Sequence, residues 1–150
     1  MQAIASGSPL TITESSDELT DIVKLFVDKN VTCVSATPSF WRKVLMTKGS
    51  ERLELKRITL GGEISDQTVL SSLKKHYERS HIVHIYASTE AGVGFSVKDG
   101  LEGFPADFIG PSKLSSVELK IADSILWIKS DRAASAILNG SITIDDDGFV

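Results

Sequence analysis

Two spacings of apolar residues alternate along roughly the first 92 positions of the chain. Apolar side chains three and four positions apart predict amphipathic helices, whereas short runs rich in β-branched residues predict buried strands. The helix-like segments are residues 19–27, 39–46 and 66–79. The strand-like segments are residues 10–12, 31–35, 57–60 and 82–86. This order predicts an α/β fold over residues 1–92, with a mainly parallel sheet flanked by helices.

Capping residues stand where these helices are expected to begin. A Ser or Thr followed three positions later by Glu forms a capping box, and proline suits the first position of a helix. Asn30 is expected to end the first helix. The predicted caps are Ser15 with Glu18, Thr37 before Pro38, and Ser65 or Asp66.

The pattern changes after about Gly92, where short strand-like segments follow one another with turn residues between them. These segments are residues 93–97, 117–121, 125–129, 136–138 and 141–144, and a hairpin turn is expected at 122–124. Residues 93–150 therefore predict a small antiparallel β-rich subdomain, incomplete at its C-terminus. Because the chain stops within an apparent strand pair, we expect it to be a segment of a longer protein.

Composition narrows the possible functions of the 150-residue chain. Apolar residues make up 41% and charged residues 24%, and the formal net charge is −4. Scattered basic residues on an acidic chain argue against nucleic-acid or anionic-membrane binding. We see neither a signal peptide nor the roughly 20 apolar residues of a membrane helix, which fits a cytoplasmic protein. The single cysteine, Cys33, excludes an internal disulfide and is expected to be a small buried residue.

Other polar residues are expected to have structural roles. The three histidines are not expected to form a metal site, since His81 and His84 should point to opposite faces of their strand. The acidic run 145–147 is expected to be a solvated turn.

Small, polar and glycine residues follow three consecutive predicted strands. Open parallel sheets bind ligands beyond the carboxyl ends of their strands. Glycine allows close approach to the backbone, tyrosine offers a stacking face, and an acid beside hydroxyl groups can hold Mg²⁺ near phosphate. The segments are Thr37-Pro38-Ser39, Gly61-Gly62-Glu63 and Ala87-Ser88-Thr89-Glu90, and Tyr86 is the last residue of the strand before the third segment. Together they suit a nucleotide.

These segments resemble motifs of the adenylate-forming superfamily, which includes acyl- and aryl-CoA synthetases, AMP-dependent ligases and peptide-synthetase adenylation domains. Residues 85–90 resemble its Tyr-x-Ser/Met-Thr-Glu signature, and residues 60–63 resemble the Gly-Gly-Glu segment that precedes it. The strand and Thr-Pro-Ser of residues 31–40, the stretch 109–128 and the Asp-x-Asp-Gly-Phe of 145–149 also resemble family segments. The match runs in order over nearly the whole chain, as an internal part of the large N-terminal domain.

The resemblance implies a role for each matching residue. Tyr86 would stack on adenine, and Gly61, Gly62, Glu63, Ala87 and Ser88 would line its pocket. Thr89 would bond the α-phosphate and Glu90 would coordinate Mg²⁺. Residues 37–41 and 91–94 would border the acyl pocket.

The family reaction joins a carboxylic acid to the AMP part of ATP with release of pyrophosphate. A thiol, coenzyme A or a carrier phosphopantetheine, then takes the acyl group. The family's phosphate loop and lysine-bearing C-terminal domain have no counterpart here, so we expect the isolated chain to be inactive without the remaining domains of its parent.

One internal segment departs from the family. Residues 138–141 occupy the place of a Thr-Gly-Asp segment whose aspartate binds ribose, and they contain no aspartate. An alternative is therefore a degenerate, non-enzymatic module that binds a nucleotide or acyl ligand. A second alternative is an unrelated flavodoxin-like or receiver-like domain, which predicts a five-stranded parallel sheet.

Overall fold

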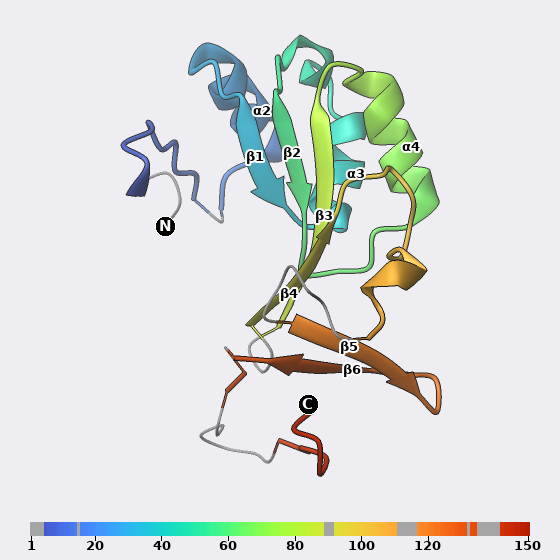
Figure 1. Cartoon of the computed structure of the whole chain (residues 1–150). Helices are drawn as coiled ribbons and strands as arrows, with labels where there is room; N and C mark the ends of the chain where they lie inside the picture. The colour runs from blue at the N-terminus through green and yellow to red at the C-terminus, as the bar shows by residue number, and fades with distance from the viewer. Residues whose placement is uncertain (1–4, 15, 89–91, 111–116, 132, 135–141) are drawn as a thin grey trace.

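The computed structural model describes residues 5–14, 16–88, 92–110, 117–131, 133–134 and 142–150. Figure 1 shows an α/β part followed by a β-hairpin that lies beyond one end of the sheet. The helices are α2 (Leu19–Asp28), α3 (Pro38–Met46) and α4 (Gln67–His76), with short 3-10 turns η1 (Ser50–Arg52) and η2 (Ala106–Phe108). The strands are β1 (Cys33–Ala36), β2 (Arg57–Leu60), β3 (His81–Ser88), β4 (Gly92–Val97), β5 (Val117–Ala122) and β6 (Ile125–Ser130).

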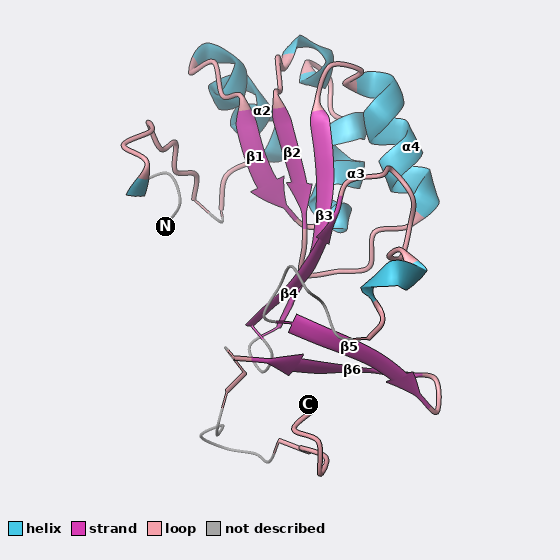
Figure 2. Ribbon diagram, viewed as in Figure 1, coloured by secondary structure: helices cyan, strands magenta, loops and turns pink. Residues whose placement is uncertain are grey.

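The main sheet has the strand order β1-β2-β3-β4. The first three strands are parallel, with Cys33 opposite Arg57 and Arg57 opposite His81. β4 returns antiparallel to β3. Helices α2, α3 and α4 lie on the same side of the sheet (Figure 2). The predicted α/β class and the mainly parallel sheet are confirmed, and the antiparallel fourth strand excludes the five-stranded parallel sheet of a flavodoxin-like or receiver-like domain.

Local capping chemistry sets the starts of two helices. The Thr37 side chain accepts a hydrogen bond from the Phe40 amide at 3.2 Å, and Pro38 occupies the first helical position. At α4 the carboxylate of Asp66 accepts from the Val69 amide at 2.9 Å. Both contacts satisfy amide groups that have no partner within the helix. The predicted caps at Thr37 and Asp66 are confirmed.

The predicted capping box of the first helix is wrong, although the helix itself lies where its apolar spacing predicts. α2 begins after Glu18, which is the N-cap but makes no side-chain capping bond, and Ser15 lies outside the described residues. Asp17 instead accepts a hydrogen bond from the Glu14 amide and closes a separate turn before the helix. Asn30 does terminate α2: its φ is +51°, a left-handed conformation that asparagine tolerates.

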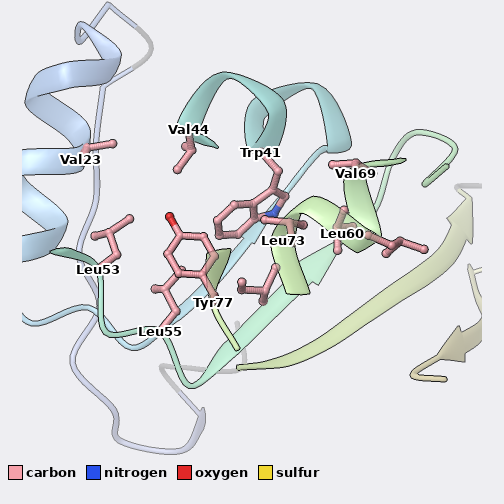
Figure 3. Close-up of a cluster of buried hydrophobic side chains, with 11 residues drawn as sticks. Val23, Trp41, Val44, Leu53, Leu55, Leu60, Val69, Leu73 and Tyr77 are labelled. Atoms are coloured by element: carbon pink, nitrogen blue, oxygen red, sulfur yellow. The ribbon is translucent and has the colours of Figure 1, made fainter. Parts of the chain in front are cut away.

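The main core lies between the sheet and its three helices. Trp41 is 1% exposed, its indole N–H donates to the Thr59 carbonyl at 3.3 Å, and its ring meets Tyr77 edge-on at 6.4 Å. Figure 3 shows Trp41 between side chains of α4 and those of the loop before β2. The buried members of this cluster are Val23, Trp41, Val44, Leu53, Leu55, Ile58, Leu60, Val69, Leu70, Leu73 and Tyr77.

Cys33 is exposed, so the prediction that it is buried is wrong. Side chains alternate between the two faces of a strand, and in β1 it is Val34 and Ala36 that pack on the core. Cys33 and Ser35 therefore point to the face of the sheet that these helices do not cover.

The hairpin of β5 and β6 forms a second, smaller cluster. Asp123 and Ser124 have φ values of +52° and +63° between Ala122 and Ile125, as a two-residue hairpin turn requires. The predicted turn is confirmed. Leu119 and Ile128 are buried, and the aromatic residues Phe95, Phe104 and Phe108 pack against them.

Two predicted strands are absent from the described residues. Residues 10–12 and 142–144 have no strand partner, and Leu10, Ile12 and Ile144 are exposed. Residues 136–138 lie outside the described residues. Within the described ranges, no helix has the length and apolar character needed to cross a membrane.

Candidate functional site

A cavity of about 360 Å³ lies at the carboxyl ends of β2 and β3. Loop residues after β2, the second half of β3, the middle of β4, the loop before η2 and the start of β6 all contribute to its walls. The lining residues are Gly62, Glu63, Ile64, Ser65, His84, Ile85, Tyr86, Ala87, Phe95, Gly103, Phe104 and Leu126. Four predicted site residues, Gly62, Glu63, Tyr86 and Ala87, are thus brought to one cavity.

The two glycines after β2 allow the loop to pass close to its neighbours. A Cβ atom on Gly61 would lie 2.9 Å from Cγ1 of Ile85, a distance that would force a shift. Gly62 has a φ of +80°, which side-chain-bearing residues rarely adopt. Gly61 therefore packs against Ile85, a residue of the cavity wall, while Gly62 itself lines the cavity.

Tyr86 presents part of its ring to solvent, with 40% of the residue exposed. The ring stacks on Phe95 with centroids 5.4 Å apart and an interplanar angle of 14°. A Cβ atom on Gly94 would lie only 3.0 Å from Cδ1 of Tyr86. The ring is thus held in place by β4 and retains surface for a ligand.

Glu63 connects the loop after β2 with the start of α3. Its carboxylate accepts a hydrogen bond from the Ser39 amide at 2.9 Å. Bonds from the side chain and backbone of Ser39, with smaller contributions from Thr37 and Arg42, lower the pKa of Glu63 below its ordinary value. Arg42 also pairs with Asp66, the cap of α4. The segments after β1 and β2 are therefore linked through charged and hydroxyl groups.

His84 lines the cavity but was not predicted as a site residue. Its Nε2 lies 3.0 Å from the Leu101 carbonyl oxygen, so this nitrogen carries the proton and donates it. His84 is 9% exposed, and the sequence gives no sign of this contact because Leu101 is 17 positions away.

A hydrogen-bonded clamp at Gln67 holds the loop that forms the outer wall. The Gln67 side chain donates to the Gly100 carbonyl at 2.9 Å and accepts from the Glu102 amide at 3.1 Å. The Glu102 carboxylate in turn accepts from the Gln67 amide at 2.8 Å, at the positive end of α4. Gly103 and Phe104 follow directly and line the cavity.

The remaining predicted residues fall outside this lining. Ser88 ends β3, while Thr89 and Glu90 lie outside the described residues, as does the 138–141 segment. Among described residues, no group of three or more acidic, histidine or cysteine side chains is arranged to hold a metal ion. The acidic run forms a turn in which the Asp145 carboxylate accepts from the amides of Asp147 and Phe149, and it pairs with Lys120.

A family model described as "AMP-binding enzyme" matches residues 1–126. The chain belongs to the AMP-binding enzyme family. No curated protein sequence matches it. The family assignment agrees with the resemblance found in the sequence motifs.

Solved structures of similar fold come from AMP-binding enzymes. The N-terminal domain of FACL13 from Mycobacterium tuberculosis is 18% identical, with a TM-score of 0.69 over 98% of this chain and 44% of that one. ATP-bound MatB from Rhodopseudomonas palustris is 14% identical, with a TM-score of 0.70 over 92% and 30%. The anthranilate CoA ligase AuaEII, solved with anthranoyl-AMP, is 15% identical, with a TM-score of 0.66 over 95% and 33%.

These structural relatives are much longer than the chain. It spans 44% of the FACL13 domain structure and about a third of the other two. The likeness confirms the fold of an AMP-binding N-terminal domain.

Proposed function

We propose that this chain forms the adenine side of the adenylate site in an ATP-dependent enzyme that activates a carboxylic acid. One observation carries the proposal: Gly62, Glu63, Tyr86 and Ala87 line a single cavity at the carboxyl ends of the parallel strands. Ligands of open parallel sheets bind at this edge. The cavity volume falls within the roughly 300–1,000 Å³ of small-molecule pockets.

The described residues fit a flat aromatic base. Tyr86 offers an exposed ring whose orientation is fixed by Phe95, and stacking on such a ring favours a planar ligand. Gly62 lines the cavity without a side chain, so a ligand can approach its backbone closely. Gly61, which packs on Ile85, and Ser88, which ends β3, complete the proposed adenine pocket. In this proposal residues 1–92 carry the adenylate-binding subdomain, and residues 93–150 form a β-rich subdomain that contributes part of the cavity wall.

The chemistry at phosphate is assigned to Thr89 and Glu90 on the basis of the motif. Thr89 would donate a hydrogen bond to the α-phosphate, and Glu90 would hold Mg²⁺, which would neutralise phosphate charge. The carboxylate attacks the α-phosphorus of ATP with release of pyrophosphate, and the thiol of coenzyme A or of a carrier phosphopantetheine then takes the acyl group with release of AMP. The acyl pocket lies beside residues 37–41 and 91–94. We expect the isolated chain to be inactive, because the family's phosphate loop and lysine-bearing C-terminal domain have no counterpart in it, and we expect the parent protein to work in the cytoplasm.

The parent protein tests this proposal through pyrophosphate exchange with a panel of carboxylic acids. Glu90→Gln is expected to lower exchange strongly while leaving the circular dichroism spectrum unchanged. Unchanged exchange would remove Glu90 from the proposed metal role. For the adenine contact, Tyr86→Ala should weaken AMP binding by about tenfold and Tyr86→Phe should preserve it, since stacking is worth about 0.5–1.5 kcal/mol.

A non-enzymatic binding module is the second candidate. It is favoured by residues 138–141, where the family's ribose-binding aspartate has no counterpart. This candidate requires that the full-length protein binds AMP or an acyl-adenylate analogue without catalysing exchange with any acid. Exchange with even one acid would exclude it.

A further inference from the structure

A second hollow, of about 1190 Å³, lies between the first half of β3 and α4, with the turn after β4 at one end. We call it the α4–β3 groove. Its apolar lining comes from Leu70 and Val83, which are buried, and from Ile82, which is partly buried. It contains no residue of the candidate adenylate cavity. Its position is therefore separate from the proposed catalytic site.

The groove runs along an open stretch of strand edge. β3 pairs with β2 from His81 onward, but its pairing with β4 begins only at His84. The His81 amide donates to the Lys56 carbonyl on the β2 side at 2.9 Å. Backbone groups of successive strand residues point to opposite sides, so the N–H and C=O of Ile82 point to the open edge. Among the described residues, none pairs with Ile82 there.

Basic side chains predominate around the groove, although the chain carries a net charge of −4. All of the charged residues that line it are exposed. They are basic Arg57, Lys74, Lys75, His81 and Lys98, and acidic Glu78 and Asp99. The ion pairs of the described residues, Arg42 with Asp66 and Lys120 with Asp145, lie elsewhere.

The end of α4 explains only part of this charge. Lys74 and Lys75 lie in its last turn, where cations are favoured by the helix dipole, and Lys74 donates to the Glu78 carbonyl at 2.9 Å. Arg57 begins β2 and Lys98 follows β4, so the dipole does not account for them. Basic side chains from α4, from β2 and from the turn after β4 thus line the same groove as the open edge of β3.

We propose that the α4–β3 groove binds an extended acidic peptide segment of a partner protein, which adds as a strand at Ile82. The exposed edge supplies main-chain hydrogen bonds, as in other cases of strand addition. The basic rim supplies charge complementarity, which speeds association and selects against basic partners. Side chains on the α4 side of the added segment contact Leu70, and those on its other face contact Val83, because Ile82 packs on the core with Leu70 and Val83 therefore points to the opposite face.

A short fluorescent peptide of alternating glutamate and valine tests the proposal on the whole chain, by anisotropy titration. The glutamate peptide should bind at least about tenfold more tightly than a matched lysine peptide. Higher salt should weaken its binding. An analogue N-methylated at alternate backbone positions should lose binding, because it cannot form the ladder. Equal binding of the acidic and basic peptides, or of the N-methylated analogue, would overturn the proposal.

Variants and nuclear magnetic resonance locate the interaction. The double variant Lys74→Gln and Lys75→Gln should weaken binding about tenfold. The matched control, Lys24→Gln with Lys48→Gln, changes the net charge equally at exposed positions outside the groove and should leave binding unaffected. Amide shifts should appear at Ile82 and Val83. Equal weakening by both double variants would overturn the proposal. Inorganic phosphate that shifts the same amides and displaces the peptide more than chloride does at equal ionic strength would also overturn it, because it would indicate a small-anion site.

Discussion

Gly61 lies against Ile85 so closely that a Cβ atom on the glycine would be 2.9 Å from Cγ1 and 3.3 Å from Cδ1 of the isoleucine. The Gly61→Ala variant must therefore displace the Ile85 side chain or the loop after β2. Overpacking of this kind costs about 1–3 kcal/mol. Urea denaturation of the chain should show this loss in the free energy of unfolding.

A double-mutant cycle separates this contact from other effects of alanine at Gly61. Ile85→Ala removes both side-chain atoms that a Cβ would meet and leaves only the Ile85 carbonyl oxygen, at 3.8 Å. In that background the cost of Gly61→Ala should fall by more than about 0.5 kcal/mol, the largest departure from additivity expected for independent sites. Costs that simply add would show that the close approach is not the reason for glycine here.

The hydrogen bond between Glu63, in the loop after β2, and Ser39, in α3, is expected to weaken in acid. Hydrogen bonds from Ser39 hold the pKa of Glu63 below its ordinary value of 4.5, so the native state favours the ionised carboxylate. The stabilising contribution is present above pH 4.5 and is lost as pH falls through the folded-state pKa. The Ser39 amide shift should follow this titration, with a midpoint below 4.5.

Glu63→Gln keeps the side-chain size and removes the charge, so the Ser39 amide should no longer titrate in this range. Glu51→Gln is a suitable control, because Glu51 accepts from the Gly49 amide at 3.0 Å and makes no described contact with Ser39. A Ser39 midpoint at or above 4.5 in the unmodified chain would contradict the proposed link.

Tyr77 is expected to make the fold sensitive to alkali. It is 6% exposed, its hydroxyl donates to the Ser50 carbonyl at 3.1 Å, and burial raises its pKa to about 12. Above pH 10 the unfolded chain loses this proton while the native state retains it, so stability falls as pH rises from 10 towards about 12. One unit of pKa difference corresponds to about 1.4 kcal/mol, so the total loss approaches about 3 kcal/mol.

Tyr77→Phe should remove this part of the alkaline slope, because phenylalanine does not ionise. At neutral pH it should cost about 1 kcal/mol through loss of the hydrogen bond to Ser50. Denaturation midpoints measured from pH 8 to 12 would reveal both effects. If the stability of Tyr77→Phe falls with pH as steeply as that of the unmodified chain, ionisation of Tyr77 is not the cause of the alkaline loss of stability.

Local chemistry explains where sequence reasoning succeeded. The Thr37-Pro38 start of α3, the Asp66 cap of α4 and the turn at Asp123-Ser124 each depend on a few neighbouring residues. Gly62, Glu63, Tyr86 and Ala87 could be assigned to one edge because strand order alone fixes where parallel strands end. The structure places these four residues in one cavity, which agrees with that argument.

Contacts between distant segments explain the errors and omissions. The exposure of Cys33 depends on which face of β1 the helices cover, and a run of apolar neighbours does not reveal that face. The capping-box spacing of Ser15 and Glu18 did not set the helix start, because a turn closed by Asp17 precedes α2. His84 could not be found from the sequence because its partner, Leu101, belongs to a loop with no recognisable motif.

The hydrogen bonds between Gln67 and the 100–102 loop hold this loop against the first turn of α4. They end at Glu102, one residue before Gly103. Any swing of the β5–β6 hairpin must therefore pivot beyond Glu102, where Gly103, with a φ of +75°, is the first residue free of the clamp. A swing of this kind would carry Leu126 away from Tyr86 and widen the cavity on one side only, leaving the Tyr86 ring in place.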